Sequence, residues 1–528
     1  FQNNNNNNNI NYKDLAKQID NFSINLSASI NNAKNITNND GSTKKKTIAF
    51  LCKPSINYVI TLLAIWRLGH VAVPLSPLHP ANEILHVIND SKSDVIISEE
   101  SLNKLIIIDD DEDVNIHNVD FETIAKNNVI NENDFKKLSQ LIIKKDHHDN
   151  VDDDAYIVYT SGTTGKPKGV VHSHKAIQTQ IEDMIEEWKW SSSDHILHFL
   201  PLHHLHGIVN KLFCCLYVGG IVEFIESHPD ILWDRIIGNN NNTINNYNNK
   251  NQSGATLFMA VPTIYQKLIE QYHTLPKEKQ VEVQEACKSF RLMISGSAAL
   301  PINVLNEWEN ITGHFLLERY GMSEFCMGLT NPYEPIENRI PGYVGMNFPS
   351  VDIRLCNYEE EDENDINFSG QESKNAVITD DPISLPSLKN GQSSPGEIRI
   401  KGNGMFSRYL NLDDITKKSF DSNGYFKTGD IAIYDSDVNS FKILGRKSTD
   451  IIKHKGYKIS ALEIERYLLE HPNILEACVF GMPDERYGES IYCLLRCVEE
   501  SLYNIDDDDC GDENTTKKHV VFEDELNT

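Results

Sequence analysis

Short apolar strands alternate with helices through the first hundred residues, and this alternation limits the possible folds more than any other feature of the chain. Residues 47–52 (TIAFLC), 71–75 (VAVPL) and 95–98 have the composition of buried strands, whereas 57–68 and 83–91 have helical spacing. Alternation of this kind predicts an α/β fold with a largely parallel sheet between layers of helices.

The same alternation returns near the C-terminus on a smaller scale. A strand-like segment, 441–444, leads to Gly445 and Arg446, and a helix (461–469) and a strand (477–481) follow. We therefore expect a large N-terminal domain of layered sheets and helices (1–444) and a small, mobile C-terminal α/β domain (445–528) that is incomplete at its end. Four polar segments cannot bury enough apolar surface to fold alone, so we expect loop insertions there: 3–9, 239–251, 358–394 and 506–518.

The charge and cysteine content exclude several classes of protein. The formal net charge is −28, the opposite of the field that binds nucleic acid. No apolar run reaches the ~18 residues of a membrane span. Ten cysteines without a Cys-x-x-Cys pair or zinc-type spacing indicate a globular protein with free, mostly buried thiols in a reducing intracellular compartment. The chain starts at Phe1 beside an asparagine run, so we expect a fragment of a longer protein, and any targeting sequence at either end would lie outside it.

One dense motif carries the chemistry. The run YTSGTTGKPKGVV (159–171) follows an apolar strand and combines glycines, hydroxyls and two lysines. Such a loop suits a polyphosphate, because backbone N–H groups, hydroxyls and ammonium groups converge on it. It is not the common P-loop, whose glycine, lysine and hydroxyl order differs. The alternative reading is a plain Gly/Ser/Thr turn between strands.

Four further motifs follow in order: SGSAAL (295–300), RYGMSE (319–324), GYFKTGD (424–430) and Gly445-Arg446. With the lysine-bearing loop they resemble the adenylate-forming superfamily of acyl-CoA synthetases, luciferases and peptide-synthetase adenylation domains, and the resemblance covers about 10–489. It implies ATP, Mg²⁺ and coenzyme A, with an acyl-AMP formed first and an acyl-CoA thioester second. The partners would be small molecules.

The resemblance also implies roles for single residues. Tyr320 would stack on adenine, Ser323 would contact phosphate, Glu324 would help to hold Mg²⁺, Asp430 would accept both ribose hydroxyls, and Arg446 would reach the nucleotide near the hinge. Lys168, Glu324 and Arg446 would be the catalytic groups. The β- and γ-phosphates would be held by Thr160, Ser161, Gly162, Thr163, Thr164, Gly165, Lys166, Pro167 and Lys168. Each residue alone would be read as an ordinary turn, cap or core position.

A basic loop, KHKGYKIS (453–460), resembles the segment that lines the thiol channel in this superfamily. The resemblance implies that Lys453, Gly456 and Tyr457 contact coenzyme A after the C-terminal domain rotates about 447–450. The alternative is an exposed turn.

The acid is indicated by two segments. LPLHHLHG (200–207) resembles the family segment with a pocket histidine, and it offers His204 and His206. TNPY (330–333), RIPG (339–342) and Val344-Gly345 resemble the malonyl-CoA synthetase branch. In that branch an arginine here would pair with the second carboxylate of malonate. We therefore expect Arg339 to bind that group, helped by Ser297 and a histidine, because a guanidinium can bind a carboxylate with two hydrogen bonds.

The family's C-terminal lysine, in a Gly-Lys setting, is not found before Thr528. The 528-residue chain as written is therefore expected to adenylate poorly. Three alternatives stay open: methylmalonate or a short- or medium-chain acid as substrate, a non-catalytic nucleotide or acyl-CoA binding protein, and an adenylation module. The resemblance suggests mitochondria, with the cytoplasm as the alternative.

Overall fold

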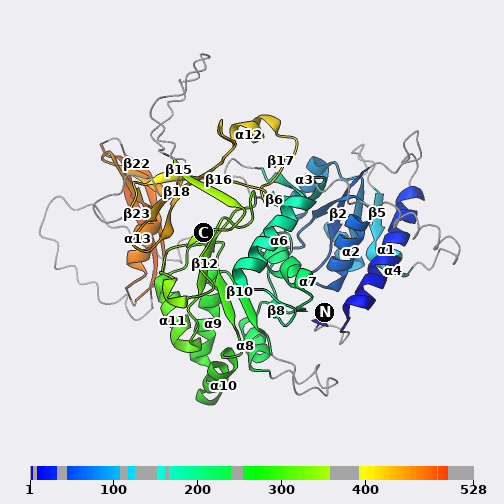
Figure 1. Ribbon diagram of the computed structural model, residues 1–528, viewed down its shortest axis with the longest axis horizontal. Coiled ribbons are helices and arrows are strands. Elements are labelled where there is room, and N and C mark those ends of the chain that lie inside the picture. Colours follow the sequence, from blue (N-terminus) through cyan, green and yellow to red (C-terminus); the bar gives the residue numbers. More distant parts are fainter. Residues whose placement is uncertain are drawn as a thin grey trace, which may run out of the picture.

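The computed structural model describes residues 2–3, 9–32, 45–106, 117–126, 152–160, 166–238, 254–356, 392–471, 473–484 and 486–497. The insertions expected at 239–251, at 506–518 and over most of 358–394 lie outside these residues, as do Ser161 to Gly165 of the predicted phosphate loop. The described chain forms two large sheets with helices, a small antiparallel sheet, and a separate C-terminal sheet drawn in orange in Figure 1.

The predicted alternation of strands and helices is confirmed in a seven-stranded sheet. Strands β6, β3, β2, β4 and β5 run parallel, whereas β7 and β17 add antiparallel edges. In sheet order the strands are β17 (Arg408–Tyr409), β7 (Lys168–Ser173), β6 (Asp154–Thr160), β3 (Val71–Pro74), β2 (Thr47–Leu51), β4 (Val95–Ser98) and β5 (His117–Asp120).

The eight-stranded sheet carries Arg319 and Tyr320 in β12. Its strands β9, β8, β10, β11 and β12 are parallel, and β13 and β14 continue it antiparallel. In order the strands are β1 (Gln2–Asn3), β9 (Ile221–Phe224), β8 (His195–His198), β10 (Leu257–Ala260), β11 (Leu292–Ser295), β12 (Leu317–Tyr320), β13 (Leu329–Thr330) and β14 (Met346–Asn347). Ligands bind outside the carboxyl ends of such parallel strands.

Helices cover both large sheets (Figure 1). Those beside the seven-stranded sheet are α1 (Tyr12–Asn32), α2 (Ile56–Arg67), α3 (Ala81–Ser91), η1 (Glu100–Leu105) and α4 (Phe121–Lys126). The others in the large part are α6 (His174–Trp188), η3 (His206–Phe213), α7 (Cys214–Val218), α8 (Pro229–Ile237), α9 (Pro262–Thr274), α10 (Lys277–Cys287), α11 (Ile302–Thr312), η4 (Ile336–Asn338) and α12 (Asp413–Lys418).

Local sequence explains where several helices begin and end. Ser173 accepts a hydrogen bond from the backbone N–H of Ala176 at the start of α6, an N-cap that satisfies a free donor of the first turn. Pro229 and Pro262 open α8 and α9, where their missing N–H costs nothing. Helix α11 ends at Gly313 with φ +74°, a left-handed cap that glycine adopts without strain.

Two small antiparallel sheets complete the described chain. The first contains β15 (Val351–Cys356), β16 (Gly396–Gly402), β18 (Phe426–Asp435) and β19 (Ser440–Arg446). The second contains β21 (Tyr457–Ser460), β20 (Ile451–His454), β23 (Gly488–Cys497) and β22 (Ile474–Asp484), with α13 (Ala461–Leu468) against it. We call residues 451–497 the lid. The sheet changes between β19 and β20, close to the predicted boundary at Gly445, and the lid helix and strand predicted from sequence are both present.

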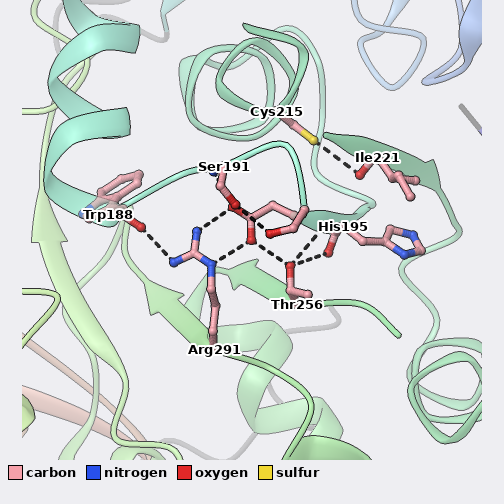
Figure 2. A network of polar contacts seen from close by, with 9 residues as sticks. Trp188, Ser191, His195, Cys215, Ile221, Thr256 and Arg291 are labelled. Atoms are coloured by element: carbon pink, nitrogen blue, oxygen red, sulfur yellow. Dashed lines mark hydrogen bonds and ion pairs between the residues drawn. The ribbon is translucent and has the colours of Figure 1, made fainter. Parts of the chain in front are cut away.

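A half-buried ion pair, with the Arg291 side chain 23% exposed, joins the eight-stranded sheet at the amino ends of β8, β10 and β11. The guanidinium of Arg291 donates to both carboxylate oxygens of Asp194 at 2.7 and 2.8 Å and to the carbonyl of Trp188 at 2.9 Å. Thr256 donates to the same carboxylate at 2.9 Å. Figure 2 shows the side chains of Arg291 and Thr256 pointing into the same network of polar contacts. This network lies at the end of the strands opposite the site residues, so we assign it a structural role.

Candidate active site

Three predicted nucleotide residues meet where β12, β18 and β19 end or pair. The hydroxyl of Tyr320 donates to Oδ2 of Asp430 at 2.6 Å, and Nε of Arg446 lies 3.2 Å from Oδ1. Asp430 and Arg446 are cross-strand partners in β18 and β19. Burial raises the pKa of Asp430, although the Tyr320 hydrogen bond and the Arg446 charge oppose the shift. A carboxylate held this way can accept hydroxyl groups of a sugar.

The two ends of the predicted phosphate loop lie in the β6–β7 hairpin. Thr160 ends β6 and is paired with Lys168 at the start of β7, so the two residues stand on either side of the loop. Lys166 is exposed, and Pro167 accepts a hydrogen-bond contact from the His86 ring at 3.2 Å through its carbonyl. The structure thus fixes both ends of the predicted phosphate loop.

Lys168 and Glu324 approach the same aromatic ring, that of Tyr409. The Lys168 Nζ lies 5.7 Å from the ring centroid, and the Tyr409 hydroxyl donates to Oε1 of Glu324 at 2.7 Å. Glu324 is buried. Next to it, the carbonyl of Ser323 contacts the His172 ring at 2.7 Å. A basic and an acidic group placed this closely suit a phosphate with a bound cation.

Glu324 has the chemistry of a Mg²⁺ ligand. This ion is commonly held by one or two carboxylates together with substrate phosphates, and Glu324 supplies one carboxylate on the phosphate side. Among the described residues no cluster of three or more His, Cys, Asp or Glu side chains could bind a metal by itself. The residues therefore fit an ion that arrives with the nucleotide.

Sequence reasoning missed Tyr409. The surrounding segment, 405–410, carries no pattern that signals chemistry. Tyr409 reaches the site only because β17 adds to the edge of β7, where Tyr409 is paired with Val170. That pairing joins residues more than two hundred positions apart.

A second polar cluster lies beside the first, around Ser297. Nδ1 of His206 lies 3.2 Å from the Ser297 hydroxyl, and a guanidinium nitrogen of Arg319 donates to the same hydroxyl at 3.4 Å. His206 opens η3, a π-helical segment, a rare geometry that is frequent at functional sites. Ser297 has φ +71°, and strain of this kind in a residue other than glycine is concentrated at ligand sites.

Within the described ranges, the cation in this cluster has no acidic partner. Arg319 is 5% exposed, its Nε has no hydrogen bond, and burial lowers its pKa to about 10 with no described carboxylate opposing the shift. Nε2 of His206 is likewise buried without a partner. Burial and then the Arg319 charge lower the pKa of His206, so its ring is neutral near pH 7. Buried charges are normally paired, so an anion bound beside Ser297 would supply the partner that Arg319 lacks among the described residues.

Sequence reasoning read RYGMSE for Tyr320, Ser323 and Glu324 but passed over Arg319. The available signal was alternation: Arg319 lies between two strand residues whose side chains point to the other face. Gly296 makes room for it, because a Cβ at that position would lie 2.6 Å from Cζ of Arg319.

Arg339, which was expected to bind the acid, has a different set of partners. Its Nε, NH1 and NH2 groups donate to the carbonyls of Pro332, Phe315 and Tyr333 at 2.9, 2.7 and 2.5 Å. The side chain is 6% exposed. All three nitrogens therefore hold backbone segments together in this structure, and the role of Arg339 in binding the acid stays a prediction.

His204 also lies apart from Ser297. It is exposed, and its ring packs against His203 with centroids 4.1 Å apart. Of the two predicted pocket histidines, the structure thus brings His206 to the cluster.

The predicted coenzyme A loop stands in the lid, between β20 and β21. Tyr457 is 73% exposed and Gly456 has φ +82°. Lys455 lies over the ring of Tyr487, 4.4 Å from its centroid, and the backbone N–H of Lys453 donates to Glu489. The loop thus packs on the lid itself in this orientation.

Family models match most of the chain. The model described as AMP-binding enzyme matches residues 5–410, and the model described as AMP-binding enzyme C-terminal domain matches 463–526. A malonate–CoA ligase of Arabidopsis thaliana is 40% identical over 463 residues, which are 86% of this chain and 68% of the relative. Malonate–CoA ligase ACSF3, mitochondrial, of Xenopus laevis is 38% identical over 85% of this chain and 74% of its own.

Solved structures agree with these relatives. ATP-bound MatB from Rhodopseudomonas palustris superposes with a TM-score of 0.70 at 25% identity, covering 93% of this chain and 84% of that one. A malonyl-CoA ligase in a ternary product complex with methylmalonyl-CoA and AMP gives 0.57 at 30% identity, covering 86% and 83%. No helix in the described ranges is both long and apolar enough for a membrane span.

Proposed function

Because the chain belongs to the AMP-binding enzyme family, we propose that it is an acyl-CoA synthetase that activates malonate or methylmalonate with ATP and transfers the acyl group to coenzyme A. The observation that carries the choice of acid is the unpaired guanidinium of Arg319 beside Ser297 and neutral His206. The malonate–CoA ligases of Arabidopsis and Xenopus support it.

A dicarboxylate explains the buried cation. One carboxylate reacts, and the other must be held in a place where water is excluded. Arg319 can donate two charge-assisted hydrogen bonds to it, and Ser297 and His206 add neutral polar contacts. A monocarboxylate would leave the guanidinium buried without a counter-ion, which is costly.

In the first step, an oxygen of the reacting carboxylate attacks the α-phosphorus of ATP. The bond to the bridging oxygen breaks, and pyrophosphate leaves with its electron pair. Asp430 with Tyr320 would hold the ribose side, while Lys168 and the hairpin around it would hold the leaving phosphates. Fixed positive charge near the leaving group lowers the barrier. Glu324 would hold Mg²⁺, which when bound neutralises phosphate charge.

In the second step, the sulfur of coenzyme A attacks the acyl carbon of the mixed anhydride. The thiol proton is released, the C–O bond to phosphate breaks, and AMP leaves. The lid loop with Lys453, Gly456 and Tyr457 would line the channel for this thiol after the lid has rotated.

We also propose that the reaction takes place in mitochondria, since the ACSF3 relatives are named as mitochondrial. Fractionation of cells that express the full-length protein tests this localisation.

Pyrophosphate release by the full-length protein tests the function. Malonate, methylmalonate, acetate and octanoate would each be supplied with and without coenzyme A. We expect release with malonate or methylmalonate at least tenfold above acetate. Release with octanoate alone would keep the family and reject the dicarboxylate pocket. Nucleotide binding without release from any acid would indicate a binding protein.

A further inference from the structure

Strand β12 presents three consecutive polar side chains to three different neighbours. Tyr320 contacts Asp430, one of the predicted nucleotide residues, and Arg319 contacts Ser297, which also lies near His206. Successive side chains of a strand point to opposite faces, so Glu318 faces away from Arg319. Its Oε1 accepts a hydrogen bond from the backbone N–H of Gly342 at 2.8 Å.

Glu318 is a buried acid on the face of β12 near the lid. It is 6% exposed, and burial raises its pKa to about 7, while hydrogen bonds from the backbone N–H groups of Gly342 and Leu300 and the charge of Arg466 oppose the rise. The positive charge of Arg466, a residue of α13 in the lid, is thus among the groups that favour the ionised form of the Glu318 carboxylate.

Arg466 lies directly over Gly342. A Cβ placed on Gly342 would be 3.5 Å from both Cζ and NH1 of Arg466, ordinary contact distance. Nε and NH1 of Arg466 are buried and have no hydrogen bond. A guanidinium loses hydration when it is buried, and attraction to Glu318 offsets part of that cost when this carboxylate is ionised. The contact joins the lid to Gly342, whose backbone N–H in turn donates to Glu318 of β12.

The orientation held by this contact is not the one in which coenzyme A would react. The lid loop 453–457 packs against Tyr487 of the lid, and Tyr457 is largely exposed. A second link, from Lys442 of β19 to Glu463 of α13 at 2.7 Å, holds the lid in the same orientation. Thioester formation requires the loop to approach the acyl group, so the lid must leave Gly342 for that step.

We propose that Arg466 is a positioning residue that docks the lid on Gly342 and Glu318 of the large domain and so favours the orientation used for adenylation. The proposal rests on the proposed function for its kinetic consequence but not for its structural one. Undocking Arg466 shifts the lid away from the orientation described here. The adenylation step then slows, while thioester formation from a supplied acyl-AMP does not.

The test compares the two half-reactions in Arg466→Ala, Arg466→Lys and Glu318→Gln. ATP–pyrophosphate exchange with malonate reports adenylation, and coenzyme A-dependent consumption of prepared malonyl-AMP reports the second step. We expect exchange to fall roughly tenfold in Arg466→Ala, with malonyl-AMP consumption unchanged or faster and partial rescue by Arg466→Lys. Arg486→Ala is the matched control, because Arg486 is an exposed arginine on the lid turn between β22 and β23.

A second readout needs no substrate. Trypsin cleavage after Arg446 or Lys447, at the junction with the lid, tracks how often this segment opens. Cleavage should be faster in Arg466→Ala than in the wild type or Arg486→Ala, and Arg466→Ala should add little in the Glu318→Gln background. Equal loss of both half-reactions, or full additivity of the two substitutions, overturns the proposal. Faster cleavage in a protein that activates no acid keeps the docking contact and rejects only the proposed function.

Discussion

Replacing Arg319 by methionine tests whether this residue binds the second carboxylate of malonate or only supports the structure of the active site. Methionine keeps much of the side-chain volume against Gly296 and removes the guanidinium that donates to Ser297. The free carboxylate of bound malonate would then have no cation in a buried place. Losing one partner of a buried charge pair costs about 2–5 kcal/mol. At about 3 kcal/mol, kcat/KM for malonate falls roughly 150-fold.

Acetate supplies the internal control, because it has no second carboxylate to lose. We expect kcat/KM for acetate to stay within about threefold of the wild type, or to rise as an uncompensated buried charge disappears. Pyrophosphate release at several concentrations of each acid gives both constants, and a melting curve checks the fold. Arg319→Lys should be intermediate, since a lysine retains charge but not the two-pronged donor. A parallel loss for malonate and acetate in Arg319→Met would refute the assignment.

Arg339→Ala gives the contrasting result. Its guanidinium bonds three backbone carbonyls, so removal leaves acceptors unsatisfied in a buried place. We expect lower stability and similar losses for every acid, measured as melting temperature and as the ratio of kcat/KM for malonate and acetate. A selective loss of kcat/KM for malonate would instead assign the second carboxylate to Arg339.

Three further predictions concern the other clusters. Arg291→Ala should lower the free energy of unfolding by about 1.5–3 kcal/mol in urea denaturation, because it removes hydrogen bonds to a charged carboxylate. Burial raises the pKa of Asp194, but hydrogen bonds from Arg291 and Ser191 outweigh it and the net pKa is lowered. The pair's contribution is therefore complete above the unfolded pKa of about 4, is lost as the pH falls through the folded pKa, and should be missing from the acid unfolding curve of Arg291→Ala. Asp430→Asn should raise KM for ATP about tenfold with a smaller change in kcat, because a charged acceptor is exchanged for a neutral one; an unchanged KM would remove it from the ribose site. Tyr409→Phe should raise the Mg²⁺ concentration for half-maximal rate several-fold, and an unchanged Mg²⁺ titration would detach Tyr409 from Glu324.

Local patterns explain how much of this fold was predictable. The strands at 47–51, 71–74 and 95–98 are short apolar runs because both faces of each are buried, and such runs are readable from composition. The lid helix begins at Ser460, whose hydroxyl accepts from the N–H of Glu463, a capping signal that is visible in the sequence. The antiparallel edge strands β13, β14 and β17 have two residues each and leave no comparable pattern.

The sequence by itself determined the chemistry of the nucleotide side, because a polyphosphate loop and its partner motifs require particular residue types at particular spacings. Tertiary structure alone decided which arginine is left unpaired. Arg319 and Arg339 are twenty positions apart and look alike in sequence. Arg339 donates to three backbone carbonyls, whereas Arg319 donates to Ser297 beside a neutral histidine. The partners that a long side chain reaches depend on how strands and loops from distant parts of the sequence pack together, and the local sequence does not determine that packing.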